Sequence, residues 1–561
     1  MTHVSSNSAT RHGGAVLVQS LVALGARYAF GVPGESYLAA LDGLHDTTGR
    51  FDFVNCRNEG GAAFMAAAWG KLTGTPGVCM VTRGPGVTNA SIGIHTAMQD
   101  SAPMIVFVGQ VGTDMKGREA FQEIDYRAVF GTMAKWAVEI DQVERIPEIL
   151  SRAWTMALSG RPGPVVVALP EDMLSAPCQA LPLDRPVRVA PPAPDMGAVA
   201  DALNLLTSSH KPLILMGGCN WTAEGRAAIE GFAEASDIPV VAAFRYQDMY
   251  NNHLNTYAGE AGVGMPAHVK SLIKQADCIL AINVRFGEMT TDGYTLLEVP
   301  NPKQRLIHAH PSALEIGKIY RPEIGIVSDP NTLSATLKPV KGDWAAWREM
   351  ARAGYEATFD LPPQPSLVDM GLVTAHLRDI LPEDVIVTNG AGNFAYWPNK
   401  AMKYNGKSRL LAPQSGAMGY GVPAAIAACF AQPEKRVVCF AGDGDFQMNF
   451  QELSAVSQYG VAPIILILNN GIYGTIRAHQ EREYPARVSG TMMVNPDFVM
   501  IAKAYGMHGE RVERTEDFAA AFERALNSPT GAVLDLNTSP EALTPRMSLS
   551  AIRAAAQKAQ S

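Results

Sequence analysis

The sequence predicts an α/β fold of three doubly wound domains with parallel sheets. Short apolar runs alternate with amphipathic stretches along the chain, a pattern typical of βα units. The runs are apolar at successive positions, so helices are expected on both faces of each sheet. A chain of 561 residues is too long for one core, and proline-rich stretches at 181–194 and 361–365 divide it. We expect domains at residues 10–180, 195–340 and 365–545.

The clearest candidate strands are short apolar runs that end in Gly, Pro or polar residues. We also expect a strand that ends near Cys56 and a helix over residues 450–458. The candidate strands lie at residues 78–82, 104–111, 164–170, 212–217, 278–284, 385–389, 436–442 and 463–470.

Composition excludes several classes of protein. Hydrophobic residues make up 47% of the chain and charged residues 18%, with a net charge of −8 and no basic cluster, so nucleic acid is not an expected partner. The seven cysteines are scattered, as in a reduced cytoplasmic enzyme. The longest apolar run, 462–468, is far short of the roughly 20 residues that span a membrane, and the first 14 residues lack the apolar core of a secretory signal.

The segment GDGDF, residues 442–446, places two carboxylates among glycines directly after an apolar strand. A helix and a second strand follow, ending in Asn469 and Asn470. A right-handed crossover brings both strand ends to one edge of the sheet, so Asp443 and Asn470 can face one point. Their oxygens suit Mg²⁺, and Gly442 and Gly444 would let backbone N–H groups approach a phosphate. The alternative is a tight turn whose aspartates cap the next helix.

This spacing, with 24 residues between GDG and the Asn pair, resembles the diphosphate-binding motif of thiamine diphosphate (ThDP) enzymes. The resemblance implies that Mg²⁺ is held by Asp443, the side chain of Asn470 and the carbonyl of Ile472. Asp445 stands where relatives carry a small polar residue, so we interpret it as support or a helix cap.

The segment FVNCRNEGG at residues 53–61 places Glu59 at the start of an Ala-rich helix, with Asn58 able to cap it. Alone, Glu59 would be an ordinary acid favoured by the helix dipole. However, GVPGESYLAALDGL (31–44), VTRGPGVTNASIGIHTAMQDSAPM (81–104), GREAFQEIDYRAVF (117–130) and GRPGPVVVALPEDM (160–173) flank it. Together they resemble the pyrimidine domain of the acetolactate synthase group, in which Glu59 falls on the catalytic glutamate that meets N1′ of the cofactor.

The last third of the chain contains GAGNFAYWP (390–398) and SGAMGYGVPAA (415–425), which resemble further cofactor loops of the family. Met418 falls on the bulky residue that bends the cofactor, although a Met in an apolar patch is also ordinary core. The carbonyl of Gly416 would accept a hydrogen bond from the 4′-amino group. The other cofactor-binding positions that the resemblance implies are Pro33, Gly34, Asn89, Gly392, Asn393, Gly442, Gly444, Asp445, Tyr473 and Gly474.

The resemblance implies that Phe121 and Gln122 contact the substrate, a small 2-oxo acid. Three positions depart from the family pattern: His479 replaces a tryptophan of the acceptor pocket, and Arg83 and His95 replace small residues. Arg83 can bind a substrate carboxylate or form a salt bridge, and His95 can relay protons or make a structural hydrogen bond.

The central domain resembles the part that binds FAD in acetolactate synthases. Arg285-Phe286 begins the relevant motif, but GEMTTDG follows it, and AGEAGVG (258–264) replaces the flavin-facing loop. The turn at Gly217-Gly218 is a weak nucleotide signal. FAD, another nucleotide such as ADP, and an empty vestige remain alternatives.

Taken together, the resemblance implies a ThDP- and Mg²⁺-dependent carboligase or decarboxylase of 2-oxo acids, similar to acetolactate synthases. It further implies a homodimer or homotetramer, with each active site between the pyrimidine domain of one subunit and the diphosphate domain of another. A decarboxylase or C–C lyase with other substrates, a non-catalytic ThDP-binding paralogue, and a flavin or nicotinamide oxidoreductase are the alternatives.

Overall fold

The computed structural model describes residues 11–560. The chain divides into two compact units between Val189 and Ala190, inside the first proline-rich stretch. The first unit holds one six-stranded sheet and the second holds two, so the prediction of three α/β domains is confirmed. Residue 10 and most of the segment examined for a secretory signal lie outside the described residues. In the described part of the chain, no helix is long and apolar enough to cross a membrane.

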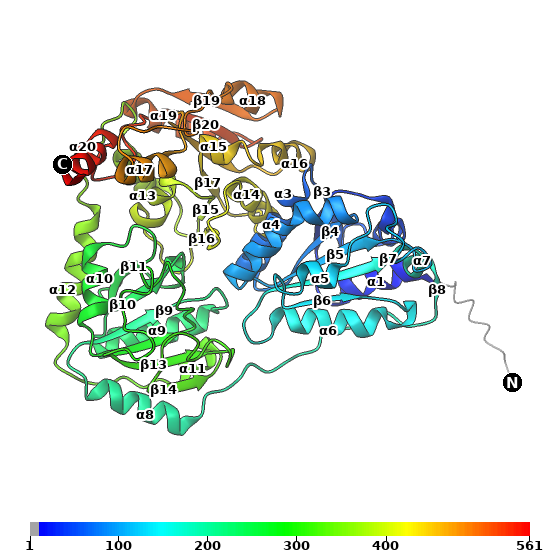
Figure 1. Cartoon of the computed structure of the whole chain (residues 1–561), viewed down its shortest axis with the longest axis horizontal. Helices are drawn as coiled ribbons and strands as arrows, with labels where there is room; N and C mark the ends of the chain where they lie inside the picture. The colour runs from blue at the N-terminus through cyan, green and yellow to red at the C-terminus, as the bar shows by residue number, and fades with distance from the viewer. Residues whose placement is uncertain (1–10, 561) are drawn as a thin grey trace. The chain divides into compact units, whose positions relative to one another are not determined.

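The first unit is built on a parallel sheet of order β3-β2-β4-β5-β7-β6. Every residue of β5 and β7 is buried, because helices cover both faces of the sheet (Figure 1). A short antiparallel pair, β1 (Arg11–His12) and β8 (Pro177–Cys178), joins its two ends. The strands are β2 (Tyr28–Gly31), β3 (Asp52–Asn55), β4 (Gly77–Val81), β5 (Met104–Gln110), β6 (Trp136–Glu139) and β7 (Pro164–Pro170). The helices are α1 (Gly13–Ala23), α2 (Leu38–His45), α3 (Glu59–Thr73), α4 (Gly84–Asp100), α5 (Tyr126–Phe130), α6 (Ile146–Leu158) and α7 (Glu171–Ser175).

The central domain has the strand order β11-β10-β9-β12-β13-β14, again all parallel. This is the order of dinucleotide-binding folds, with the switch point between β9 and β12. The strands are β9 (Pro212–Met216), β10 (Val240–Ala243), β11 (Tyr257–Ala261), β12 (Cys278–Ile282), β13 (Arg305–His310) and β14 (Ile324–Val327). The helices are α8 (Met196–Thr207), α9 (Ala223–Ser236), α10 (Ala267–Gln275), α11 (Pro330–Thr336) and α12 (Ala345–Glu356).

The C-terminal domain has the order β16-β15-β17-β18-β20-β19, the same permutation as the first unit. A π-helix, Trp397–Ala401, lies between its first two strands in the chain. The strands are β15 (Ile386–Asn389), β16 (Arg409–Leu411), β17 (Val437–Gly442), β18 (Ile464–Asn469), β19 (His508–Val512) and β20 (Ala532–Asn537). The helices are α13 (Met370–Ile380), α14 (Gly421–Ala431), α15 (Asp443–Phe446), α16 (Leu453–Tyr459), α17 (Gly474–Glu483), α18 (Phe498–Ala504), α19 (Thr515–Leu526) and α20 (Leu549–Gln560).

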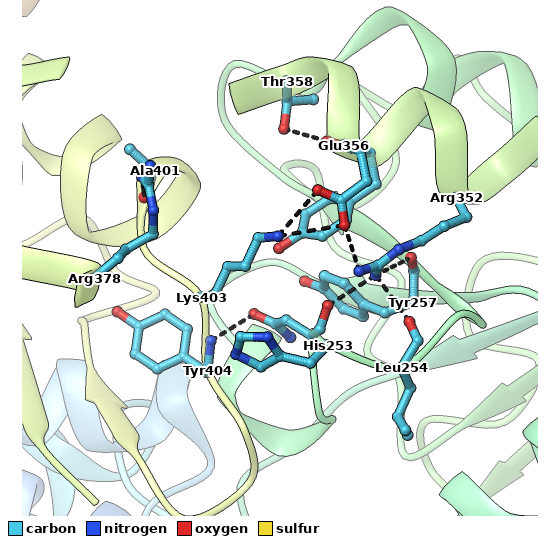
Figure 2. Close-up of polar contacts among 12 residues, drawn as sticks. His253, Leu254, Tyr257, Arg352, Glu356, Thr358, Arg378, Ala401, Lys403 and Tyr404 are labelled. Atoms are coloured by element: carbon cyan, nitrogen blue, oxygen red, sulfur yellow. Dashed lines mark hydrogen bonds and ion pairs between the residues drawn. The ribbon is translucent and has the colours of Figure 1, made fainter. Parts of the chain in front are cut away.

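The second proline-rich stretch, 361–365, does not separate two compact units, because the central and C-terminal domains are bonded to each other. Asn252 and Tyr404 exchange two hydrogen bonds, of 2.7 and 3.0 Å. Lys403 pairs with Glu356 at the end of α12, as Figure 2 shows. The two domains therefore belong to one compact unit, residues 190–561.

Candidate active site

Asp443 is buried at the carboxyl end of β17, and its carboxylate accepts hydrogen bonds from the loop that follows β18. Its Oδ2 accepts hydrogen bonds from the backbone N–H groups of Asn470, at 3.2 Å, and Gly471, at 2.7 Å. Its Oδ1 accepts from the N–H of Gly444 at 2.9 Å. Burial raises the pKa of Asp443 against the opposing effect of these hydrogen bonds. The crossover therefore brings Asp443 and Asn470 together, as the spacing predicts.

Two side chains that the sequence reasoning missed complete this corner. The amide of Asn495 donates to Asp443 Oδ2 at 2.8 Å and to Asn469 Oδ1 at 2.9 Å. Gln447 donates to the carbonyl of Asp443 at 3.2 Å and to Asn495 Oδ1 at 3.0 Å. Asn495 follows Asp443 by 52 positions in an irregular loop, so no regular spacing marks it.

The carboxylate of Asp445 accepts hydrogen bonds from different residues than that of Asp443. Its Oδ1 accepts from the N–H groups of Ala391, at 3.1 Å, and Gly419, at 2.9 Å. Burial raises its pKa to about 7, while these hydrogen bonds and the nearby charge of Arg245 oppose the shift. Asp445 thus joins the 390–393 loop to the end of the 413–419 segment, a supporting position.

A cavity of about 210 Å³ opens beside this corner, within the C-terminal domain. Its lining includes Asp443, Asn470, Met418 and Gly416, which the sequence analysis assigned to cofactor binding. The remaining predicted positions that line it are Gly392, Asn393, Gly442, Gly444, Asp445, Ile472, Tyr473 and Gly474.

The glycines of the cavity wall are required by their protein neighbours. A Cβ on Gly442 would lie 2.7 Å from the ring of Phe394, and one on Gly444 would lie 2.7 Å from the ring of Tyr473. A Cβ on Gly474 would lie 2.4 Å from Asn393 Oδ1. Side chains on these residues would push Phe394, Tyr473 and Asn393 out of place, so the wall keeps its shape only with glycine.

In the first unit, Glu59 is the first residue of α3, and Asn58 caps the helix by accepting from the N–H of Gly60 at 2.8 Å. Asn89 of α4 donates to Glu59 Oε2 at 3.0 Å. Glu59 is half-buried, so this amide holds a carboxylate that is still accessible. Pro33 and Gly34 lie in the loop after β2.

Arg83 already has a carboxylate partner. Its Nη2 lies 2.9 Å from Glu171 Oε2, and its Nη1 donates to the carbonyl of Phe121 at 3.4 Å. The arginine is buried, whereas Phe121 is 73% exposed and Gln122 has a φ of 65°. These contacts favour a buried salt bridge that shapes the Phe121-Gln122 loop.

His95 on α4 and His479 on α17 are both exposed. His479 belongs to the helix that begins at Gly474 and whose first turn, including Ile476, lines the cavity. Their assignment to the substrate stays a prediction.

In the central domain, the side chain of Asn283 fills the space beside the turn after β9. A Cβ on Gly218 would lie 1.9 Å from Asn283 Nδ2, and that amide donates to Asn220 Oδ1 at 2.8 Å. The AGEAGVG segment, expected to be a loop, begins as a strand, because residues 258–261 belong to β11, and Glu260 of that strand is buried and forms an ion pair with Lys400 of the C-terminal domain. The segment that the sequence aligns with a flavin contact thus carries an interdomain ion pair.

Comparison with known families supports this reading of three domains. The chain matches three descriptions: "Thiamine pyrophosphate enzyme, N-terminal TPP binding domain" at residues 11–129, the central domain at 199–338, and the C-terminal TPP binding domain at 390–536. The chain belongs to the family of thiamine pyrophosphate enzymes.

Within that family, the chain is similar to acetolactate synthases. It is 33% identical to the acetolactate synthase isozyme 3 large subunit of Escherichia coli over 92% of each chain. It is 30% identical to the isozyme 2 large subunit of the same organism, over 92% of this chain and 94% of that one. The mitochondrial catalytic subunit of Saccharomyces cerevisiae is also 30% identical, over 90% of this chain and 78% of its own. The predicted resemblance is therefore confirmed.

The residues of the C-terminal cavity fit thiamine diphosphate and a divalent cation. Asp443 and the Asn470 amide bring oxygen atoms that could hold a cation to one end, and Met418, Leu468 and Ile476 form an apolar wall. An anionic diphosphate with its cation suits the polar end, and an aromatic ring suits the apolar wall.

Proposed function

We propose that this chain is a ThDP- and Mg²⁺-dependent enzyme that makes or breaks C–C bonds next to the carbonyl of small 2-oxo acids, as an acetolactate synthase-like carboligase or decarboxylase. The observation that carries the proposal is the meeting of Asp443 with the Asn470 loop beside a cavity of about 210 Å³. Membership of the thiamine pyrophosphate enzyme family supports it.

In this proposal each residue has a distinct task. Asp443, the side chain of Asn470 and the carbonyl of Ile472 hold Mg²⁺, with the loops at 390–393 and 442–445 around the diphosphate. Bound thiamine diphosphate supplies carbanion stabilisation next to a carbonyl. Glu59, fixed by Asn89, holds a proton at N1′ of the pyrimidine. Gly416 and Met418, which also line the cavity, position the cofactor.

Substrate selection is assigned to Phe121, Gln122 and His479, with His95 as a further candidate. The ion pair with Glu171 favours a structural role for Arg83 over direct capture of a substrate carboxylate. An exposed Phe121 and an exposed His479 are available to a donor or acceptor.

Calorimetric titration with ThDP and Mg²⁺ tests the first part of the proposal, and the absence of binding would contradict it. A mass-spectrometric screen of 2-oxo acid donors with aldehyde and keto-acid acceptors tests the reaction. Binding of ThDP without turnover of any pair would favour a non-catalytic paralogue.

Glu59→Gln keeps the shape of the side chain and removes its charge. We expect C2–H/D exchange of bound ThDP and turnover to fall by roughly a hundredfold or more, since one acid–base group contributes about 10²–10⁴-fold. Calorimetry should still show ThDP binding, because the Asp443 corner is intact. Undiminished exchange would reject the role of Glu59.

Three finer points belong to the proposal. FAD or another nucleotide in the central domain is a second candidate ligand, favoured by the strand order, and the absorption spectrum of the purified protein tests it. We propose a homodimer or homotetramer, and a cytoplasmic location that suits seven buried cysteines scattered along the chain.

A further inference from the structure

The segment from Pro413 to Gly419 forms one wall of the cofactor cavity and is fixed at both ends. The N–H of Gly416 donates to the carbonyl of Pro413 at 3.1 Å, which closes a turn. At the far end, the N–H of Gly419 donates to Asp445 Oδ1 at 2.9 Å. Gly416, with a φ of 66°, and Met418 lie between these two anchors. The position of both cavity residues therefore depends on both anchors.

The first anchor is made by the central domain. Arg245 Nη1 donates to the same Pro413 carbonyl that closes the turn. Gln414 Nε2 donates to the carbonyl of Phe244 at 2.8 Å. Just upstream, the carboxylate of Asp248 accepts from the Arg409 side chain and from the N–H of Leu410, both at 3.0 Å. The strand β16 and the turn after it are thus attached to the segment that follows β10.

Arg245 is itself held in an unusual conformation. It is only 6% exposed and has a φ of 61°, in the left-handed region that a residue with a Cβ seldom adopts. Its N–H donates to Glu260 Oε1 at 2.9 Å, and its guanidinium lies over the ring of Phe244. Backbone strain of this kind persists only where the surroundings enforce it, and it gathers at functional sites.

Glu260 links this arrangement to a second cavity wall. Its Oε2 forms an ion pair with Lys400, which also donates to the Glu260 carbonyl at 3.2 Å. Lys400 belongs to the π-helix Trp397–Ala401, and π-helices are frequent at functional sites. In the same π-helix Asn399 accepts from Gln247 and donates to Asn389 Oδ1 at 3.1 Å, the residue directly before the 390–393 loop.

We propose that Arg245, fixed by Glu260 and Lys400, is a positioning residue of the active site: it sets the Pro413–Gly419 wall from the neighbouring domain. This inference rests on the proposed function for its catalytic meaning. A displacement of about 1 Å at a catalytic group costs on the order of a hundredfold in rate, so an anchor of this wall can control activity without touching the cofactor.

Arg245→Met removes the donors and keeps much of the apolar stem. We expect peptides over 413–419 to exchange backbone hydrogens faster in the cofactor-free protein. We also expect the Kd of ThDP to rise and the C2–H/D exchange rate at saturating ThDP to fall, each by roughly tenfold or more. Arg245→Lys keeps one donor and should recover part of both.

Lys403→Met is the matched control, because Lys403 also crosses this domain interface (Figure 2). It pairs with Glu356 and lies over the ring of Phe359, without contact to the 413–419 wall. We expect it to leave loop exchange and ThDP affinity at wild-type values. Equal losses in Arg245→Met and Lys403→Met would overturn the proposal, since general loosening of the interface would then explain both.

Wild-type loop exchange and ThDP affinity in a folded Arg245→Met protein would also overturn it. If that variant does not fold, Arg245→Lys decides: faster loop exchange at an unchanged Tm supports the anchor, and wild-type exchange rejects it. The loop measurement needs no cofactor, so failure of the wild type to bind ThDP would contradict the proposed function alone.

Discussion

Asp443 and Asp445 stand two positions apart and serve different neighbours, because they occupy the first turn of a very short helix, Asp443–Phe446. Asp443 turns toward the loop after β18, and Asp445 turns toward the N–H groups of Ala391 and Gly419. The resemblance predicted this separation of roles, and the contacts supply a physical basis for it.

Asp445→Asn and Asp445→Ala should therefore differ in stability. Asparagine keeps the Oδ1 that accepts from both N–H groups, whereas alanine leaves two buried donors unpaired at about 1–3 kcal/mol each. We expect a small loss of unfolding free energy for the first variant, under roughly 1.5 kcal/mol, and a clearly larger one for the second. Urea unfolding of both proteins provides the measurement, and equal losses would contradict this account.

His308 makes the folding stability of the central domain depend on pH. Burial beside Phe286 lowers the pKa of His308 from 6.5 to about 4, and the hydrogen bond of its ring to the carbonyl of Val284, at 3.0 Å, opposes that shift. The unfolded chain then binds more protons than the folded one between pH 6.5 and 4, so stability is full above 6.5 and falls as the pH drops through that window.

The loss of unfolding free energy should approach roughly 3 kcal/mol near pH 4, because a pKa difference of one unit corresponds to 1.36 kcal/mol. His308→Gln, which keeps an amide donor, should flatten this part of the profile. Unfolding midpoints measured at steps from pH 7.5 to 4.5 test the prediction. A variant whose midpoints fall as steeply as those of the wild type would exclude His308 as the cause.

At the scale of elements, the C-terminal helix α20 is held to α17 by an apolar cluster that includes Ala478 and Ile552 and by a charged network around Glu481. Glu481 of α17 is buried and accepts two hydrogen bonds from Arg553 of α20, at 2.8 and 2.7 Å, and one from Arg477 at 2.9 Å. The hydrogen bonds from Arg553, then from the N–H of Ala486 and from Arg477, hold its pKa at about 2, well below 4.5, against the opposing effect of burial. The stabilisation is thus complete above pH 4.5 and is lost as the pH falls from 4.5 toward 2.

Arg553→Met should detach α20 without unfolding the domain. Because a detached α20 no longer holds the segment that leads to it from β20, we expect early proteolytic cleavage between residues 538 and 549, with the rest of the chain intact. Limited proteolysis followed by mass spectrometry measures this. The matched control is Arg514→Met, whose exposed partner Glu516 joins no second helix. Equal cleavage in the two variants would contradict the role of Arg553.

The elements show where sequence reasoning succeeds and where it fails. Runs such as β5 and β17 were predicted because nearly all of their residues are apolar, and the structure buries every one of them. The strand β13, RLIHAH, was missed because two buried histidines interrupt its pattern, and β20 was missed because it contains the buried Asp535, which pairs with Arg511. The edge strands β6 and β14 are partly exposed and carry little apolar signal.

The same limit applies to the site. Asp443 and Asn470 were predicted because a fixed strand–helix–strand spacing joins them. Asn495 and Arg245 reach their partners from irregular loops, 52 and 168 positions away along the chain, and no periodicity encodes such contacts. Pairs of this kind follow only from tertiary packing.

At the scale of the whole molecule, the first and last domains share one strand permutation, and each carries half of the proposed machinery. Glu59 lies in the first and Asp443 in the last. If each active site combines these domains from two subunits, as the family resemblance implies, then Glu59→Gln and Asp443→Asn disable opposite halves of one site, which belong to different chains. A heterodimer of the two variants retains one intact site and one site with both changes.

Mixing the two inactive proteins under conditions that exchange subunits should thus restore activity. Random pairing makes half of the dimers mixed, and each mixed dimer has one working site of two, so about a quarter of the wild-type specific activity is expected. The control is the Glu59→Gln, Asp443→Asn double variant mixed with Glu59→Gln, a mixture in which every site lacks the glutamate. Activity at the level of that control, despite subunit exchange shown by native mass spectrometry, would place each site within a single chain, because only an arrangement across subunits lets two defective chains complement each other.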